Sequence, residues 1–282
     1  MKLASYSTAS GSGYGVVAGD GIVALSTRLG DKAPTLRDLL AKDLLGEAAK
    51  LAQSAKPDFA LSAIAFEPVI PNPDKIICVG LNYRDHVAET GRTVTEKPAL
   101  FARFAGCQVG HLAPMIKPKV SDQFDYEGEM AVIIGKGGRY IKNADALKHV
   151  AGYSCYNEGS VRDWQRHTSQ FLAGKTFAGT GGFGPWMVTA DEIPPGTKLT
   201  LSCRLNGERM QHADTDMMIF KFPKLIEYIS AFTPLAAGDV IVTGTPGGVG
   251  SRRTPPVWMK PGDTVEIEID KVGTLVNTIG QD

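Results

Sequence analysis

The sequence lacks an excess of charge of either sign. Thirty Lys and Arg residues balance thirty Asp and Glu residues among 282, so the formal net charge at pH 7 is zero. A protein that holds nucleic acid through its overall field carries an excess of basic residues. We therefore predict no nucleic-acid partner. The length allows one or two domains with a large core.

Cysteine is sparse and scattered. The sequence contains four cysteines, and no two of them form a C-x-x-C pair. They are Cys78, Cys107, Cys155 and Cys203. This spacing excludes a zinc knuckle and a thioredoxin-type motif, and the five histidines contain no H-x-x-x-H pair. A reduced, cytoplasmic chain is the simplest interpretation.

Long apolar runs are also missing. No stretch approaches the roughly 18 unbroken apolar residues of a membrane helix, so we expect no membrane partner. The N-terminal residues Met1–Tyr6 lack the apolar core of a signal peptide, and none is predicted. Gly11–Gly15 is rich in glycine, but strand-like residues follow it. Without a helix to receive a phosphate, it does not predict a nucleotide site.

Short strands and turns dominate what is present. Val16–Ala18 and Ile22–Leu25 flank Gly19–Gly21, which predicts a hairpin. Residues 35–55 have the leucine spacing of a helix, with Thr35 as its N-cap. Strands outnumber helices, so the predicted fold is mostly β with covering helices, in the α+β class.

A cluster of prolines divides the chain. Pro68–Pro73 contains three of them, and the apolar strand Lys75–Gly80 follows at once. We therefore predict a small N-terminal domain over residues 1–70 and a second domain over residues 71–282. The candidate catalytic and metal-binding residues all lie in the second domain.

Two glutamates stand at the start of a strand. Glu127 and Glu129 are two apart, so on a strand they share one face, and Met130–Ile134 continues as an apolar run. One interpretation is a solvated edge strand. The apolar run instead favours burial, and buried like charges need a cation or a shared proton between them. A hard divalent cation with oxygen ligands is the natural partner.

A histidine and a glutamate follow the strand Lys75–Gly80. His86 and Glu89 are three apart and share a face if this segment is helical. A carboxylate beside an imidazole orients the ring as a base. The alternative is an exposed helical ion pair. The position after a core strand and a glycine favours a site.

Polar residues recur at helical spacing further on. Glu158, Arg162 and Gln165 are spaced as i, i+4 and i+7, which predicts one polar helical face that is either solvated or lines a site. Lys175 lies in a glycine-rich loop and is either exposed or functional. Arg162 either has a role in the site or forms an ion pair with Asp163 or Glu158.

These segments together resemble the fumarylacetoacetate hydrolase superfamily over residues 75–277, and in particular its bacterial acylpyruvate hydrolase-like members. The matching segments are Val79–Tyr83 with His86 and Glu89, Asp125–Glu129, Gly152–Gln165, Gly174–Phe177, Asn206-Gly207 with Gln211 and Thr215, Gly238–Ile241, and Thr243–Pro246. The resemblance implies a β-sandwich roll as the catalytic domain, a small N-terminal domain and a homodimer.

The resemblance also implies one Mg²⁺ or Mn²⁺ ion per subunit. Glu127 and Glu129 would hold the ion together with a third acid, Glu158, where the family usually has an aspartate. Arg103, within the apolar strand Pro98–Phe104, takes the place of a lysine of the family.

The activity implied is that of a metal-dependent hydrolase that cleaves a C–C bond of a ketonic substrate. That substrate would be a 2,4-dioxo acid, such as fumarylpyruvate or a 2,4-diketo-3-deoxy sugar acid, and the products pyruvate and a carboxylic acid. His86, tuned by Glu89, would activate water, and Lys175 would donate to developing charge. The expected substrate contacts are Arg103, Tyr156, Arg162, Gln165 and Thr245.

Two alternatives remain, a different reaction at the same site and a protein without catalytic activity. The same residues suit oxaloacetate decarboxylation, or isomerisation or hydration of a 2-oxo-dienoate in the catabolism of aromatic compounds. A non-catalytic relative that only binds a ligand would be expected to lack one of the residues above.

Overall fold

Three β-sheets form the framework of the computed structural model, which describes residues 1–282. Along the twelve-stranded sheet lie β4 (Phe59–Ala60), β3 (Gly21–Ala24), β2 (Gly11–Ala18), β1 (Lys2–Thr8), β14 (Gly181–Thr189), β12 (Val150–Glu158), β11 (Gly128–Ile134), β17 (Val240–Val242), β6 (Ile76–Gly80) and β7 (Ala99–Arg103), with β5 (Ala65–Phe66) on β1 and β8 (Gln108–Val109) on β14. The five-stranded sheet contains β16 (Glu208–Asp214), β15 (Thr200–Leu205), β18 (Thr264–Ile269), β19 (Gly273–Gln281) and β9 (Met115–Lys117). The third sheet pairs β10 (Phe124–Asp125) with β13 (Ser160–Val161). The predicted mostly-β, α+β fold is confirmed.

Short helices cover and connect the sheets. They are α1 (Leu25–Leu29), α2 (Leu36–Ala41), α3 (Leu45–Gln53), α4 (Arg84–Glu89), α5 (Arg162–Gln165), α6 (Leu172–Lys175) and α7 (Phe222–Phe232). The predicted helix over residues 35–55 is present as α2 and α3, and Thr35 caps α2 by accepting from the N–H of Asp38. No helix of the chain combines the length and the apolar character needed to cross a bilayer.

Strand β11 is buried on both faces, and this explains its apolar sequence. Met130, Val132 and Ile134 pack in the core that the five-stranded sheet shares with the large sheet. Ala131 and Ile133 point the other way, into a second core with residues of α2 and β6. Two-sided burial requires a continuous apolar run instead of alternation. Any carboxylate at the start of this strand is therefore held inside the protein.

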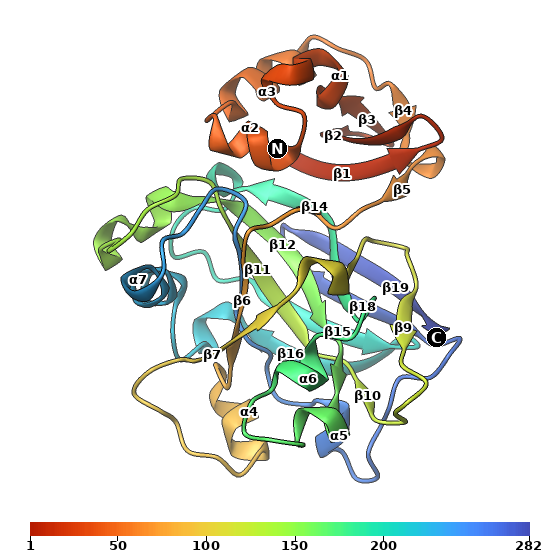
Figure 1. Ribbon diagram of the computed structural model, residues 1–282, viewed down its shortest axis with the longest axis vertical. Coiled ribbons are helices and arrows are strands. Elements are labelled where there is room, and N and C mark those ends of the chain that lie inside the picture. Colours follow the sequence, from red (N-terminus) through yellow and green to blue (C-terminus); the bar gives the residue numbers. More distant parts are fainter.

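The N-terminal strands extend the large sheet. Pairing of Lys2 with Val188 and of Leu3 with Met187 joins β1 to β14, so residues on either side of the proline cluster share one sheet. Figure 1 shows this N-terminal part, in red and orange, at one end of the molecule. The hairpin around Gly19 is confirmed, because Ala18 pairs with Gly21. The division at residue 70 stays a prediction.

Several strand ends meet at one edge of the large sheet. Strand β11 begins at the edge where its antiparallel neighbours β12 and β17 end. Strand β6 is parallel to β17 and also ends there, and it leads into α4. Figure 1 shows α4, α5 and α6 together at this end, away from the N-terminal helices. The fold thus brings polar residues from four strands to one place.

Candidate active site

Three glutamates converge at this edge. Glu127 directly precedes β11, and Glu129 is the second residue of this strand. Glu158 ends β12 beside them, since the Glu158 N–H donates to the Glu127 carbonyl at 2.9 Å. The three residues are 3%, 1% and 1% exposed. One carboxylate oxygen of each lies within 4.8 Å of the others. The interpretation of Glu127 and Glu129 as a solvated edge pair is therefore wrong.

Lys175 enters the cluster from the end of α6. Its Nζ atom lies 2.5 Å from Glu127 Oε2 and 2.7 Å from Glu158 Oε2, and the residue is 2% exposed. Lys175 is thus part of a helix and buried, whereas the sequence suggested a glycine-rich loop. Glu158 Oε1 has no hydrogen-bond partner although it is buried, and Glu129 Oε2 accepts only the N–H of Gly244.

The cluster holds more negative charge than its cations balance. Burial and the other two glutamates raise the pKa of Glu129 well above its usual value, and burial also raises that of Glu158. At Glu127, burial opposes ionisation, but Arg162 and Lys175 outweigh it, so the pKa is lowered. Hard carboxylate oxygens, one of them unpartnered, fit a divalent metal ion, which would supply the missing positive charge.

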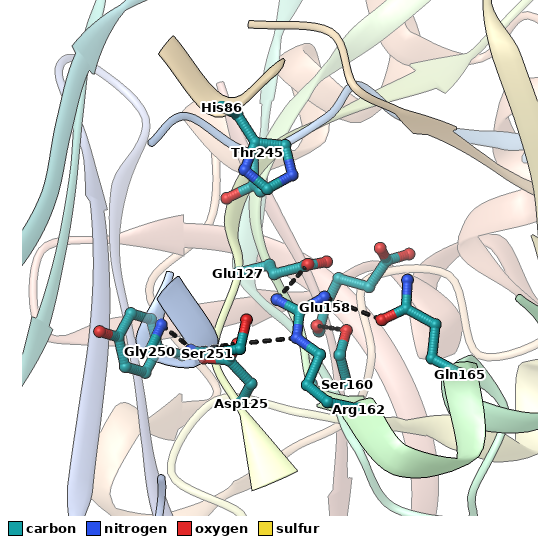
Figure 2. A network of polar contacts seen from close by, with 12 residues as sticks. His86, Asp125, Glu127, Glu158, Ser160, Arg162, Gln165, Thr245, Gly250 and Ser251 are labelled. Carbon is teal, nitrogen blue, oxygen red and sulfur yellow. Dashed lines mark hydrogen bonds and ion pairs between the residues drawn. The ribbon is translucent and has the colours of Figure 1, made fainter. Parts of the chain in front are cut away.

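A second buried network lies beneath the glutamates. Arg162 donates from Nε to Asp125 Oδ2 at 2.7 Å, and its Nη2 lies 2.6 Å from Glu127 Oε1. Asp125 also accepts the N–H groups of Gly250 and Ser251 at 2.8 and 3.0 Å (Figure 2). The alternatives of Asp163 or Glu158 as partners of Arg162 are therefore wrong. Arg162 links the glutamate cluster to a fixed structural pair.

The spacing of Glu158, Arg162 and Gln165 predicted one helix, and this is wrong. Glu158 belongs to β12, whereas Arg162 and Gln165 belong to the single turn α5. All three nevertheless line the same cavity, and Arg162 Nη1 donates to Gln165 Oε1 at 3.0 Å. They meet because only Gly159 and the two residues of β13 separate the end of β12 from the start of α5.

His86 faces the cluster from α4. Its Nδ1 lies 2.7 Å from Glu89 Oε1, and Glu89 Oε2 accepts the N–H of Gly248 at 2.8 Å. His86 is 7% exposed and lines the cavity, with its ring above Glu127 and Glu158 in Figure 2. Because Glu89 is held from two sides, it orients the imidazole and leaves the other ring nitrogen for proton transfer.

A cavity of about 460 Å³ joins these groups. Its wall contains the three glutamates, His86, Lys175, Arg162, Gln165, Thr245, Phe101, Phe171, Arg92, Arg166, Arg252 and several small residues. Thr245 reaches this wall but its hydroxyl is engaged, since Oγ1 donates to the Gly128 carbonyl at 2.9 Å. The wall is mostly polar, and its arginines and Lys175 suit a small anionic ligand.

Two expected substrate contacts lie outside this wall. Arg103 is 2% exposed and donates to the Gly159 carbonyl and to Thr180 Oγ1 at 3.0 and 2.8 Å. Tyr156 is fully buried and donates to Gln108. Arg103 thus holds the backbone directly after Glu158, and neither Arg103 nor Tyr156 is part of the cavity wall in this structure.

Sequence reasoning assigned no role to several groups that the structure places at the site. Asp125 stands next to the paired glutamates, and that position was the only local signal for it. Arg166 and Arg252 reach the cavity wall from segments far apart in sequence. No spacing pattern connects them, so only the folded chain reveals them.

Comparisons with known proteins show which family and which enzymes the chain resembles. Residues 75–280 match the family described as fumarylacetoacetate (FAA) hydrolase, C-terminal. A mitochondrial oxaloacetate tautomerase of Bos taurus is 44% identical over 225 residues, which cover 79% of this chain and 72% of the relative. The oxaloacetate tautomerase YisK of Bacillus subtilis is 42% identical over 227 residues, covering 79% of this chain and 75% of the relative.

A solved structure adds a ligand-bound relative. The maleylpyruvate hydrolase of Sphingobium sp. SYK-6, in complex with manganese(II) and pyruvate, superposes with a TM-score of 0.83 at 28% identity. The match covers 100% of this chain and 99% of that one. That enzyme therefore holds a divalent metal ion and a 2-oxo acid on the same fold.

Proposed function

This chain belongs to the fumarylacetoacetate hydrolase family, and from that premise we propose that it is a metal-dependent enzyme that transfers a proton beside the keto group of a 2-oxo acid. The preferred candidate reaction is the keto–enol tautomerisation of oxaloacetate. The observation that carries the proposal is that His86, held by Glu89 at 2.7 Å, lines the same cavity as the three buried glutamates.

Glu127, Glu129 and Glu158 would hold Mg²⁺ or Mn²⁺. When bound, such an ion would act as a Lewis acid on a substrate carbonyl and favour its enol form. The manganese complex of the Sphingobium relative supports this choice of ion. The unpartnered Oε1 of Glu158 is the group in this chain that most needs such a ligand.

The residues around this centre can move one proton and stabilise charge. In tautomerisation a proton leaves carbon 3 and a proton arrives at the oxygen on carbon 2, so neither water nor an oxidant is consumed. His86 is placed to accept the carbon-3 proton and return it. Lys175 and Gln165 line the cavity and are placed to donate hydrogen bonds to the substrate oxygens.

Oxaloacetate is preferred because of the relatives. Proteins with 42% to 44% identity over most of this chain are named oxaloacetate tautomerases, in an animal and in a bacterium. Decarboxylation of oxaloacetate would use the same centre, but it would not need the oriented base at His86. The His86–Glu89 contact therefore favours proton transfer over decarboxylation.

C–C hydrolysis of an acylpyruvate is the second candidate. The same dyad supplies a base for water, and the cavity of about 460 Å³ leaves room for a longer acyl chain. The Sphingobium relative is named a maleylpyruvate hydrolase, which supports this reaction on the same fold. A cytoplasmic homodimer with a role in aromatic-compound catabolism stays a prediction.

The test compares products from one preparation. Purified protein with Mg²⁺ or Mn²⁺ is given enol-oxaloacetate, and the ultraviolet absorbance of the enol is followed beside assays for CO₂ and pyruvate. We expect fast loss of the enol above the rate with metal alone, with no matching CO₂. If the protein instead releases pyruvate and a carboxylic acid from acylpyruvates and does not convert the enol, its function is hydrolysis and not tautomerisation.

A further inference from the structure

Three exposed arginines line the cavity without a counter-ion. Arg92, Arg166 and Arg252 are part of its wall, and none of their guanidinium groups takes part in an ion pair or hydrogen bond. The buried cations of the same cavity differ, because Arg162 pairs with Asp125 and Glu127, and Lys175 pairs with two glutamates. The cavity thus offers positive charge that the protein itself does not neutralise.

Arg166 and Arg252 reach the wall of the same cavity from two different segments of the chain. Arg166 is the C-cap of α5, and Arg252 ends a short 3₁₀ turn that starts at Gly250. Burial lowers the pKa of Arg166, and the positive charges of Arg162 and Arg252 lower it further. Two positive charges on the wall of one cavity attract an anion.

Asp163, three residues before Arg166 in the sequence, is otherwise engaged. Asp163 accepts hydrogen bonds from Ser121 Oγ at 2.7 Å and from the Trp164 N–H at 3.0 Å. It forms no ion pair with Arg166. The third arginine, Arg92, lies 5.4 Å from the centroid of the Phe171 ring and is held by that aromatic face. The pair Arg166 and Arg252 has no such partner.

Arg166 follows closely on a residue that contacts the glutamate cluster. Arg162 contacts Glu127 at the start of α5, and Arg166 follows about one helical turn later, roughly 5 Å along the axis. A compact dicarboxylate spans such a separation between its two ends. Paired N–H donors make guanidinium groups suited to carboxylates.

We propose that Arg166 and Arg252 form a subsite for the second carboxylate of the substrate, the one at the far end from the glutamate centre. The enzyme then selects four-carbon dicarboxylates over otherwise equal monocarboxylates. This inference rests on the proposed function, because the first carboxylate and its neighbouring oxygen must be taken by the centre that His86 faces.

The test measures binding instead of turnover. Calorimetry on Mn²⁺-loaded protein compares malate with 2-hydroxybutanoate, which has the same chain length but a methyl group in place of the distal carboxylate. Oxalate, which has no distal group, reports on the metal centre alone. The variants are Arg166→Gln, Arg252→Gln and their combination. Arg209→Gln, on exposed β16 away from the cavity, removes an equal charge as the control.

We expect wild type to bind malate roughly tenfold to hundredfold more tightly than 2-hydroxybutanoate, as hydrogen bonds to a charged group allow. The double variant should lose this preference and keep its oxalate affinity within about twofold, whereas Arg209→Gln should keep both. A preference that survives in the double variant, or is absent in wild type, overturns the subsite. If wild type shows the preference yet does not convert enol-oxaloacetate, the subsite stands and the proposed function fails.

Discussion

Two networks of buried charge lie side by side, and they differ in how completely the protein satisfies them. Asp125 receives three hydrogen bonds, from Arg162 and from the N–H groups of Gly250 and Ser251. Glu129 is equally buried but accepts only one, from Gly244, while two other glutamates crowd it. We call the first network closed, because its carboxylate has its hydrogen-bond partners, and the second open, because its carboxylates lack them.

This difference indicates which network stabilises the fold and which one marks a functional site. A buried charge with all its partners stabilises the fold, and its loss leaves an uncompensated partner behind. A buried charge without enough partners destabilises the protein until a ligand arrives, so it marks a site. The raised pKa of Glu129 and the unpartnered Oε1 of Glu158 place the open network in the second class.

Replacing Glu129 by Gln should have the largest effect on function. The amide can still accept from Gly244, but it is a poor ligand for a hard cation. We expect affinity for Mn²⁺, measured by calorimetry, to fall more than about 100-fold and activity to vanish. Without metal, the variant should be at least as stable as wild type in urea, because like-charge repulsion is removed. Glu208→Gln, on an exposed strand end, is the matched control, and unchanged metal affinity in Glu129→Gln would refute the ligand assignment.

Replacing His86 by Ala should come next. The base is lost while the glutamates stay in place, so Mn²⁺ affinity should be unchanged and the rate should fall about 10²–10⁴-fold. Rates with enol-oxaloacetate and with acylpyruvates check this. His212→Ala, at an exposed position, serves as the control. A fall of less than about twofold would remove His86 from the chemistry.

Replacing Asp125 by Asn should damage the closed network and hence the fold. Arg162 then loses one of its two carboxylate partners while it stays buried. We expect the free energy of unfolding to fall by about 3 kcal/mol, measured by urea denaturation without metal. Asp145→Asn, which breaks an exposed pair with Lys148, should change it little. Equal stability of Asp125→Asn and Glu129→Gln would erase the contrast between the networks.

The smallest expected effect is the pH dependence of stability that comes from His111, which lies outside both networks. Burial lowers its pKa to about 4, below the ordinary value near 6.5, so the unfolded chain binds the proton more readily. The stability contributed by neutral His111 is therefore complete above pH 6.5 and is lost as the pH falls toward 4. Linkage between these two pKa values gives roughly 2 kcal/mol between pH 7 and pH 5, and because the ring is only partly buried we expect solvent screening to reduce the loss to about 1 kcal/mol. The pH series in urea should flatten in His111→Asn, and an unchanged slope would contradict this.

Local patterns predicted much of the fold. The hairpin at Gly19, the cap at Thr35 and the apolar strand after Glu129 each depend on neighbours in sequence, and all are present. The helix expected from Glu158 to Gln165 failed, because a strand end and a single turn reproduce the same side-chain spacing. Periodicity alone does not distinguish these arrangements over so few residues.

The sequence by itself determined that Glu127 and Glu129 share a face and that His86 meets Glu89, since both pairs follow from the geometry of one element. The family resemblance named Glu158 as the third acid. Only the tertiary structure decided that Asp125 is satisfied by backbone groups 125 and 126 residues away, and that Arg166 and Arg252 line one cavity. The reason is physical. Strand pairing and loop closure bring distant residues together, and whether a buried charge is compensated depends on everything that surrounds it.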